Sequence, residues 1–186
     1  MQSDAEEVSD DDLIERVAAG DRRAFSALMS RHLDRAYSLA HRMTGSRSDA
    51  EDIVQEALAR VWTKASSWQR GGARFSTWLY RVVLNLCVDL RRRSRLRPEG
   101  LDAAEEVVDP GPGAEASLAE AQRNARVAAA VAALPERQRA AVVLTYTTGL
   151  SNAEAAELMH LSVKAFEALL VRARRTLRAS LADAEL

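Results

Sequence analysis

One predicted helix in the first half of the chain carries side chains suited to an unpaired nucleic-acid base. Trp78, Arg81, Asn85, Asp89 and Arg92 follow one another at spacings of three or four residues, so they share one side of that helix. An indole stacks on a base, an amide reads a base edge, and a guanidinium holds a phosphate. Trp78 equally fits a core position, because aromatic residues at helical spacing often pack inward. The pattern leaves both interpretations of this tryptophan open.

The stretch before this helix predicts a flexible, cationic loop. Aromatic and basic residues flank two glycines there: Trp68, Gln69, Arg70, Gly71, Gly72, Ala73, Arg74 and Phe75. Glycine gives the backbone of such a loop its freedom. Ser76 or Thr77 is expected to cap the helix that follows. The inward stripe of that helix is Leu79, Val82, Val83, Leu86 and Leu90.

A second predicted helix, just before the loop, has an apolar face and an acidic face. Ser48, with Glu51 three residues later, matches a capping box at its start. The apolar face is Ile53, Ala57, Val61 and Trp62. The opposite face is Glu51, Asp52, Gln55 and Glu56. A solvated acidic face is the ordinary interpretation of this pattern, and a docking surface is the alternative.

The last third of the chain predicts a helix-turn-helix at about residues 152–171. Ser151 with Glu154 forms a capping box for the first helix, and Ser162 is expected to cap the second. The second helix is basic near its end and would place its N-terminal residues against base edges. The side chains expected to meet DNA are Ser162, Lys164, Glu167, Ala168, Arg172 and Arg175. Helical hairpins of this size also occur in bundles that bind no DNA.

Composition predicts an all-α fold of two small helical domains. Alanine, leucine, arginine and glutamate dominate, and β-branched runs of period two are absent. Residues 98–117 contain three prolines, three glycines, six acidic residues and no basic one, which indicates an acidic, flexible linker. The expected domains are residues 1–97 and 118–186.

The distribution of charge matters more than its sum. A net charge of −1 is unusual for a chain that binds phosphates. Residues 1–97 nevertheless hold 17 basic and 14 acidic side chains, and seven of those acids precede Arg16. Five arginines crowd the end of the same segment: Arg91, Arg92, Arg93, Arg95 and Arg97. Charge is therefore segregated along the chain.

Nothing in the sequence predicts an enzyme, a cofactor or a metal site. No Gly-rich phosphate loop, Cys-x-x-Cys or His-Glu-x-x-His occurs, and His32, His41 and His160 lack metal-ligand spacing. The single cysteine, Cys87, cannot form an intramolecular disulfide. With no secretory segment and no apolar run of about 20 residues, the chain is expected to be cytoplasmic, without membrane insertion of its own.

Three segments together resemble region 2 of the bacterial sigma-70 family, in its extracytoplasmic-function (ECF) group. They are D-A-E-D-I-V-Q-E at 49–56, F-S-T-W-L-Y-R-V-V-L-N at 75–85 and R-R-R at 91–93. With the helix-turn-helix, L-P-E-R-Q-R-A-A-V-V-L at 134–144 resembles region 4 of that family. The resemblance extends from about residue 11 to 177.

The resemblance implies a promoter-specificity subunit that binds core RNA polymerase, at the beta-prime clamp helices and the beta flap. The acidic face, Glu51, Asp52, Gln55 and Glu56, would dock on the clamp helices. Region 4 would bind the −35 element, and a cognate anti-sigma factor would restrain the protein until a stress signal. The −10 element would be read and melted by Trp68, Gln69, Arg70, Arg74, Trp78, Arg81, Asn85 and Arg92.

One segment departs from the family's pattern. Where the family often has Gly-Thr-Val-Lys-Ser-Arg, this chain has Lys164, Ala165, Phe166, Glu167, Ala168 and Leu169. Glu167 either accepts from a cytosine amino group or marks a surface that never meets DNA. The second case would suit a sigma mimic that titrates an anti-sigma factor. A stand-alone helix-turn-helix regulator is a further alternative, but it leaves the first domain without a role.

Overall fold

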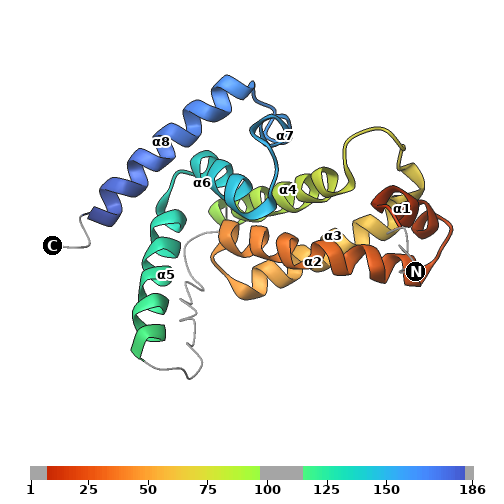
Figure 1. The fold of residues 1–186 in the computed structure, drawn as a ribbon, viewed down its shortest axis with the longest axis horizontal. Helices are drawn as coiled ribbons and strands as arrows, with labels where there is room; N and C mark the ends of the chain where they lie inside the picture. Colours follow the sequence, from red (N-terminus) through yellow and green to blue (C-terminus); the bar gives the residue numbers. More distant parts are fainter. Residues whose placement is uncertain (1–7, 97–114, 183–186) are drawn as a thin grey trace, which may run out of the picture.

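The computed structural model describes residues 8–96 and 115–182, and all regular structure in these ranges is helical (Figure 1). The predicted linker lies outside the described residues except for its last three, which already belong to a helix. Of the helices within the two described ranges, none combines the length and apolarity that crossing a bilayer demands. The all-α prediction is confirmed.

The first four helices form one bundle around the second of them. Their bounds are α1 (Asp10–Ala18), α2 (Arg22–Thr44), α3 (Arg47–Lys64) and α4 (Phe75–Leu96), with a single 3₁₀ turn, η1 (Ala65–Ser67), after α3. Ser9 caps α1 by accepting from the Asp12 backbone N–H at 3.1 Å. Gly45 ends α2 in the left-handed conformation at φ 77°. Helix α2 packs against α1, α3 and α4, and its buried Leu28 and Leu39 lie in the shared core.

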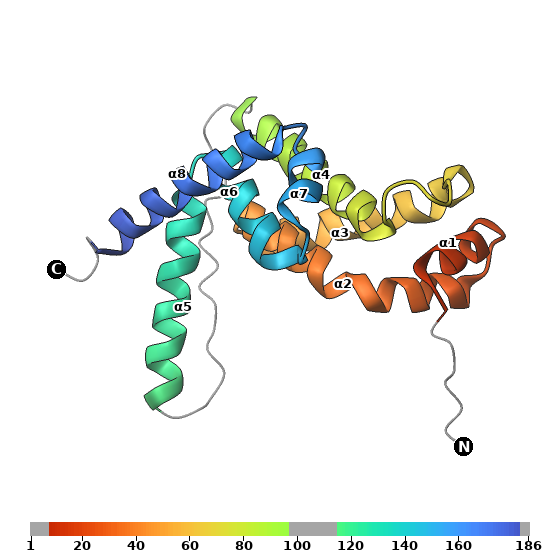
Figure 2. The same ribbon diagram turned by 45° about the horizontal axis from the view of Figure 1, so that its top comes forward.

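The remaining helices form a second unit. They are α5 (Glu115–Ala133), α6 (Glu136–Val143), a π-helical turn η2 (Leu144–Thr148), α7 (Asn152–Leu158) and α8 (Val163–Ala182). The capping box of Ser151 and Glu154 is present, and Ser162 accepts from the Ala165 N–H at 3.2 Å. In both ribbon views α5 and α8 reach away from the first four helices (Figures 1 and 2). The predicted helix-turn-helix is α7 and α8.

Two predicted caps are wrong because the helices begin earlier. Helix α3 starts directly after Gly45, so Ser46 is its N-cap and accepts from the Asp49 N–H at 3.2 Å, and Ser48 lies inside the helix. Helix α4 starts at Phe75, so Thr77 is an internal, buried residue. Burial of the Phe75 ring in the core sets this start.

The spacing of Trp62 predicted a core position, but this residue lies outside the core. Its side chain is 39% exposed and meets Phe25 edge-on, with ring centroids 5.4 Å apart. Val61, the preceding residue, takes the inward position instead. Two neighbouring residues on a helix differ by about 100°, so only one of them faces the core fully.

A buried arginine joins the two units. Arg139 in α6 is 4% exposed and donates to the Met43 carbonyl at 3.0 Å and the Leu134 carbonyl at 3.2 Å. Met43 lies in the last turn of α2, where backbone carbonyls lack helical partners and a cation is favoured by the helix dipole. Helix α2 also contacts α5, α6 and the π-helical turn. Arg139 therefore connects the core of the second unit to the end of the central helix.

Replacing this arginine tests the connection. Arg139→Met keeps apolar volume but leaves buried carbonyls without their donor, so we expect the free energy of unfolding to fall by about 1.5–3 kcal/mol. Arg137→Met, at an exposed position of the same helix, is the matched control and should stay within about 0.5 kcal/mol of the parent. Urea denaturation measures both. Equal stability of the two variants would contradict the structural role of Arg139.

Candidate nucleic-acid and polymerase interface

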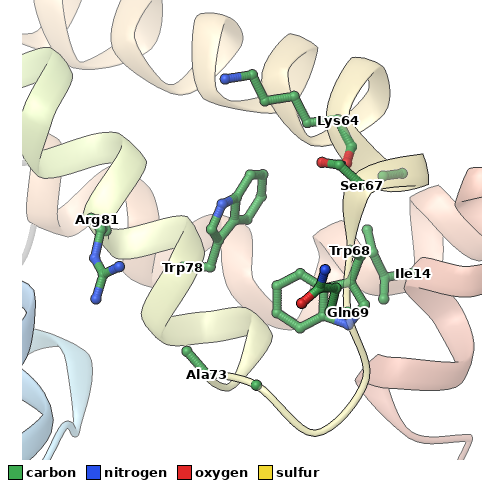
Figure 3. Close-up of a pocket in the computed structure, with 10 residues that line it drawn as sticks. Ile14, Lys64, Ser67, Trp68, Gln69, Ala73, Trp78 and Arg81 are labelled. Carbon is green, nitrogen blue, oxygen red and sulfur yellow. The ribbon is translucent and has the colours of Figure 1, made fainter.

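A cavity of about 250 Å³ lies where the loop after η1 returns to α4. Trp68 and Gln69 from the loop and Trp78 and Arg81 from α4 line it together, with Ile14 of α1 on the far side (Figure 3). Four of the residues predicted for −10 binding therefore meet at one cavity. The cavity itself was not predicted, because it depends on contacts between the loop and α1, which lie more than 50 residues apart in the sequence.

Two indoles line this cavity, and a buried phenyl ring packs against both of them. Phe75 is buried, whereas Trp68 and Trp78 are half-buried. The ring centroids of Trp68 and Trp78 lie 6.1 Å apart at 75°, and each indole lies about as close to Phe75. Edge-to-face contacts of this kind hold rings in fixed orientations. Trp78 packs on the core and also borders the cavity, so the core interpretation is confirmed and base stacking stays a prediction.

Trp78, Arg81, Asn85, Asp89 and Arg92 lie along one side of α4, as predicted, and form a ridge on it. Asn85 and Arg92 are exposed, Arg81 is half-buried, and Arg92 pairs with Asp89 at 3.2 Å. Beyond the cavity, the ridge therefore presents an amide and guanidinium groups to solvent. The loop before α4 turns at Gly71. This residue adopts φ 84°, a backbone conformation that strongly favours glycine.

Carboxylates of α1 bind the arginine of the loop. The Arg70 Nε lies 2.8 Å from Glu15 Oε1, and its Nη2 donates to Asp12. Hydrogen bonds from the Ser9 hydroxyl and then from Arg70 lower the pKa of Asp12 below its usual range. Hydrogen bonds to Asp12 and then to Glu15 raise the pKa of Arg70.

Carboxylates of α7 lie opposite two more predicted DNA-binding arginines. Arg81 is 3.4 Å from Glu157, and Arg74 is 3.7 Å from Glu154. Both contacts join the second unit to the first. Sequence reasoning missed them, because each pair is separated by about 80 residues and local periodicity carries no signal for it.

The acidic face of α3 is exposed as predicted, and it borders a groove. Glu51, Asp52, Gln55 and Glu56 are all exposed. A groove of about 350 Å³ runs between α3 and α4. Its lining includes apolar Ile53, Leu86 and Leu90 and acidic Asp49, Asp52 and Glu56. A helix with an apolar stripe and basic flanks would complement these side chains.

Helix α8 presents the face that periodicity predicted. Phe166, Leu170 and Ala173 are buried against the preceding helices. The exposed residues include Ser162, Lys164, Glu167, Ala168, Arg172 and Arg175. The exposed residues in the first two turns of the helix are therefore Val163, Lys164, Glu167 and Ala168.

No metal or thiol chemistry emerges from the described residues. Within them, no group of three His, Cys, Asp or Glu side chains is placed to hold a metal ion. Cys87 is buried in α4, and burial raises the pKa of its thiol to about 12. A thiol with so high a pKa is a poor nucleophile at neutral pH.

Two family models match the two units. Residues 28–97 match Sigma-70 region 2, and residues 124–177 match Sigma-70 region 4. The fold and these matches define a sigma-70 protein of two regions joined by a linker. Region 2 comprises most of the first bundle, and region 4 contains the helix-turn-helix.

Relatives identify the group within this class. The chain is 31% identical over 179 residues to the ECF RNA polymerase sigma factor SigW of Bacillus subtilis (strain 168), covering 91% of this chain and 95% of SigW. It is 34% identical over 182 residues to the RNA polymerase sigma factor CnrH of Cupriavidus metallidurans, covering 93% and 95%. The chain belongs to the ECF RNA polymerase sigma factors. This family is not one of catalytic enzymes.

Solved structures agree with the assignment. CnrH in complex with the cytosolic domain of CnrY superposes with a TM-score of 0.71 at 31% identity, covering 95% of this chain and 99% of CnrH. The sigma factor RpoE of Bartonella quintana, in complex with the anti-sigma factor NepR, gives a TM-score of 0.65 at 21% identity, covering 84% and 96%. The second likeness is one of fold alone.

Proposed function

We propose that this ECF sigma factor is a cytoplasmic promoter-specificity subunit that binds core RNA polymerase and directs initiation by recognising −35 and −10 elements. The observation that carries the proposal is the cavity shared by Trp68, Gln69, Trp78 and Arg81 at the end of the α4 ridge. Aromatic rings beside an amide and a guanidinium are the groups that proteins use to hold unpaired bases.

In this proposal the −10 element is opened and read along α4. A base leaving the duplex would enter the cavity, stack on an indole and meet the Gln69 amide. Asn85 is exposed farther along the same side and would read a neighbouring base edge. Arg81 and Arg92 would hold phosphates, which fix the register of the strand.

Polymerase docking is assigned to the acidic face of α3 and the groove beside it. The beta-prime clamp helices would place basic side chains against Asp52 and Glu56, with apolar side chains entering the groove over Ile53. Complementary charge of this kind speeds encounter and fixes register. Region 4 would contact the beta flap and carry −35 recognition on α8.

An anti-sigma factor is proposed as the restraining partner. The solved relative at TM-score 0.71 is CnrH bound to the cytosolic domain of CnrY, and the superposition covers both regions of this chain. In this chain Glu154 and Glu157 lie against Arg74 and Arg81, so the arrangement places region 4 against the proposed −10 surface. A partner that stabilises this arrangement would keep promoter DNA out.

One observation favours a second function. Glu167 is exposed near the N-terminus of α8, where a reading helix places its base contacts. A carboxylate there repels phosphates unless it accepts from a cytosine amino group. A sigma mimic that titrates an anti-sigma factor without reading DNA would tolerate it.

Charge reversal on α3 tests polymerase docking. Asp52→Arg with Glu56→Arg should weaken binding to core polymerase about tenfold or more, since like charges then face each other across the interface. Asp34→Arg with Glu120→Arg reverses two exposed acids elsewhere and is the matched control. Pull-down and fluorescence titration measure both, with circular dichroism to check folding. If the folded Asp52→Arg, Glu56→Arg variant binds core polymerase as tightly as the control does, the acidic face of α3 is not the docking surface.

Substitutions along the ridge test −10 reading. Trp78→Ala should reduce open-complex formation about 5- to 150-fold, because a lost base stack costs about 1–3 kcal/mol. Asn85→Ala should change base preference on a panel of −10 variants, including pre-melted templates, while core binding stays at the parent level. Unchanged preference for Asn85→Ala would exclude it as a base reader.

Glu167→Gln separates the two functions of region 4. If Glu167 reads a cytosine, the variant should relax preference at one −35 position by about 1–3 kcal/mol, or about 5- to 150-fold. If it does not, affinity for all duplexes should rise together as repulsion is removed. Electrophoretic mobility shifts on single-position −35 variants measure this. A uniform rise, with no transcription by the parent from any promoter, would favour the sigma mimic.

A further inference from the structure

Helix α1 is tied to the loop that borders the −10 cavity. The Trp68 Nε1 donates to Asp11 Oδ1 at 3.2 Å. Arg70 donates to Asp12 and, through Nε and Nη2, to the two carboxylate oxygens of Glu15 at 2.8 and 3.3 Å. Both contacts join segments that lie more than 50 residues apart in the sequence. The acidic first turns of α1 thus reach the loop at two separate side chains.

We propose that Asp11, Asp12 and Glu15 are positioning residues for this loop, and that Arg70 is an internal anchor of the loop instead of a phosphate contact. The inference rests on the proposed function, in which the loop reads the −10 element. It reverses the sequence-based assignment of Arg70 to DNA. It also gives three of the acidic residues before Arg16 a role in promoter reading.

The charge around Arg70 supports the anchor. One guanidinium faces two carboxylates, so the local sum is one negative charge. A phosphate approaching this group would meet net repulsion unless the carboxylates withdrew. The fork of Arg70 is also used in a bidentate contact with Glu15, the geometry that guanidinium and carboxylate groups match best.

Helix α1 is packed firmly enough to serve as a rigid support for the loop. Leu13, Ile14 and Val17 are 3%, 1% and 2% exposed, so its apolar face is locked into the bundle. Asp10 binds His32 Nε2 at 2.6 Å and Arg31 at 2.9 Å on α2. The loop, in contrast, contains Gly71 and Gly72 and is mostly exposed. The rigid element therefore sets the shape of the flexible one.

The contacts between α1 and the loop affect the cavity through Trp68. Its indole borders the cavity and lies edge-on to Trp78, and the hydrogen bond to Asp11 selects one orientation of the ring. Ile14, from the buried face of α1, lines the same cavity. Loss of the α1 contacts would leave the two indoles without their outer support.

A charge-swap cycle tests the proposal. Asp12→Asn is introduced throughout, so that one ion pair, Arg70 with Glu15, remains. In this background Arg70→Glu and Glu15→Arg should each lower open-complex formation about three- to tenfold, and the double variant should return to within about twofold of the background. Core binding, measured in parallel, should stay constant across the four proteins.

The other outcomes overturn the anchor. If Arg70 contacts a phosphate, the double variant stays as low as Arg70→Glu. If α1 is an acidic mask over the loop, Glu15→Arg exceeds the background. If no single reversal changes open-complex formation, the tie has no function in promoter reading.

Hydrogen exchange of the loop amides separates this inference from the proposed function. Exchange at residues 69–73 should rise in each single reversal and fall again in the double variant, whether or not DNA is present. If the parent supports no transcription but exchange follows this pattern, the proposed function fails and the loop anchor stands. If the parent transcribes and exchange does not respond, the anchor fails alone.

Discussion

Pairing between carboxylates and arginines within the chain constrains the proposed promoter surface. Arg70 binds Asp12 and Glu15, and Arg81 lies 3.4 Å from Glu157. A guanidinium held by a carboxylate offers less net charge to a phosphate. The net charge of −1, puzzling for a DNA-binding protein, thus has a structural counterpart, because acids of α1 and α7 lie directly on the basic face. DNA binding by that face requires some of these pairs to separate.

The pairs differ in strength, and the difference decides which of them separate. Arg74 and Glu154 lie 3.7 Å apart with the arginine 81% exposed, so solvent and salt screen their attraction. The bidentate contact of Arg70 with Glu15 has shorter distances and a rigid partner helix. If DNA binding separates the two regions, as the proposed function requires, the α7 contacts would be released while α1 keeps its contacts with the loop. The α7 contacts thus suit covering of the proposed promoter surface, and the α1 contacts suit shaping of the loop within it.

Local rules predicted much of the helical structure. Caps at Ser151 and Ser162 were predicted correctly, because the side chain and the amide that it accepts from are three residues apart. The same rule failed at Ser48 and Thr77, where the left-handed Gly45 and burial of Phe75 move the helix starts upstream.

Helical periodicity also placed many candidate residues correctly in space. Lys164 and Glu167, expected to face DNA, are exposed, and Phe166 between them is buried, because the period of 3.6 residues fixes side-chain direction. Periodicity carried no information about the cavity at Trp68 or about Arg139. Those features arise when segments distant in sequence pack together. Their roles were therefore open to reasoning only after the helices had been assembled.

The resistance to opening lies away from the promoter surface. Each contact of α7 with Arg74 and Arg81 has one well-exposed partner and is 3.4 Å or longer, and such pairs contribute little free energy. Arg139 is buried, and its loss of the Met43 carbonyl would leave polar groups of both regions desolvated without partners. Moving region 4 away thus depends mainly on rehydrating the end of α2. In the proposed regulation, a partner that covers that junction would hold region 4 in place more firmly than one that only contacts the arginines of α4.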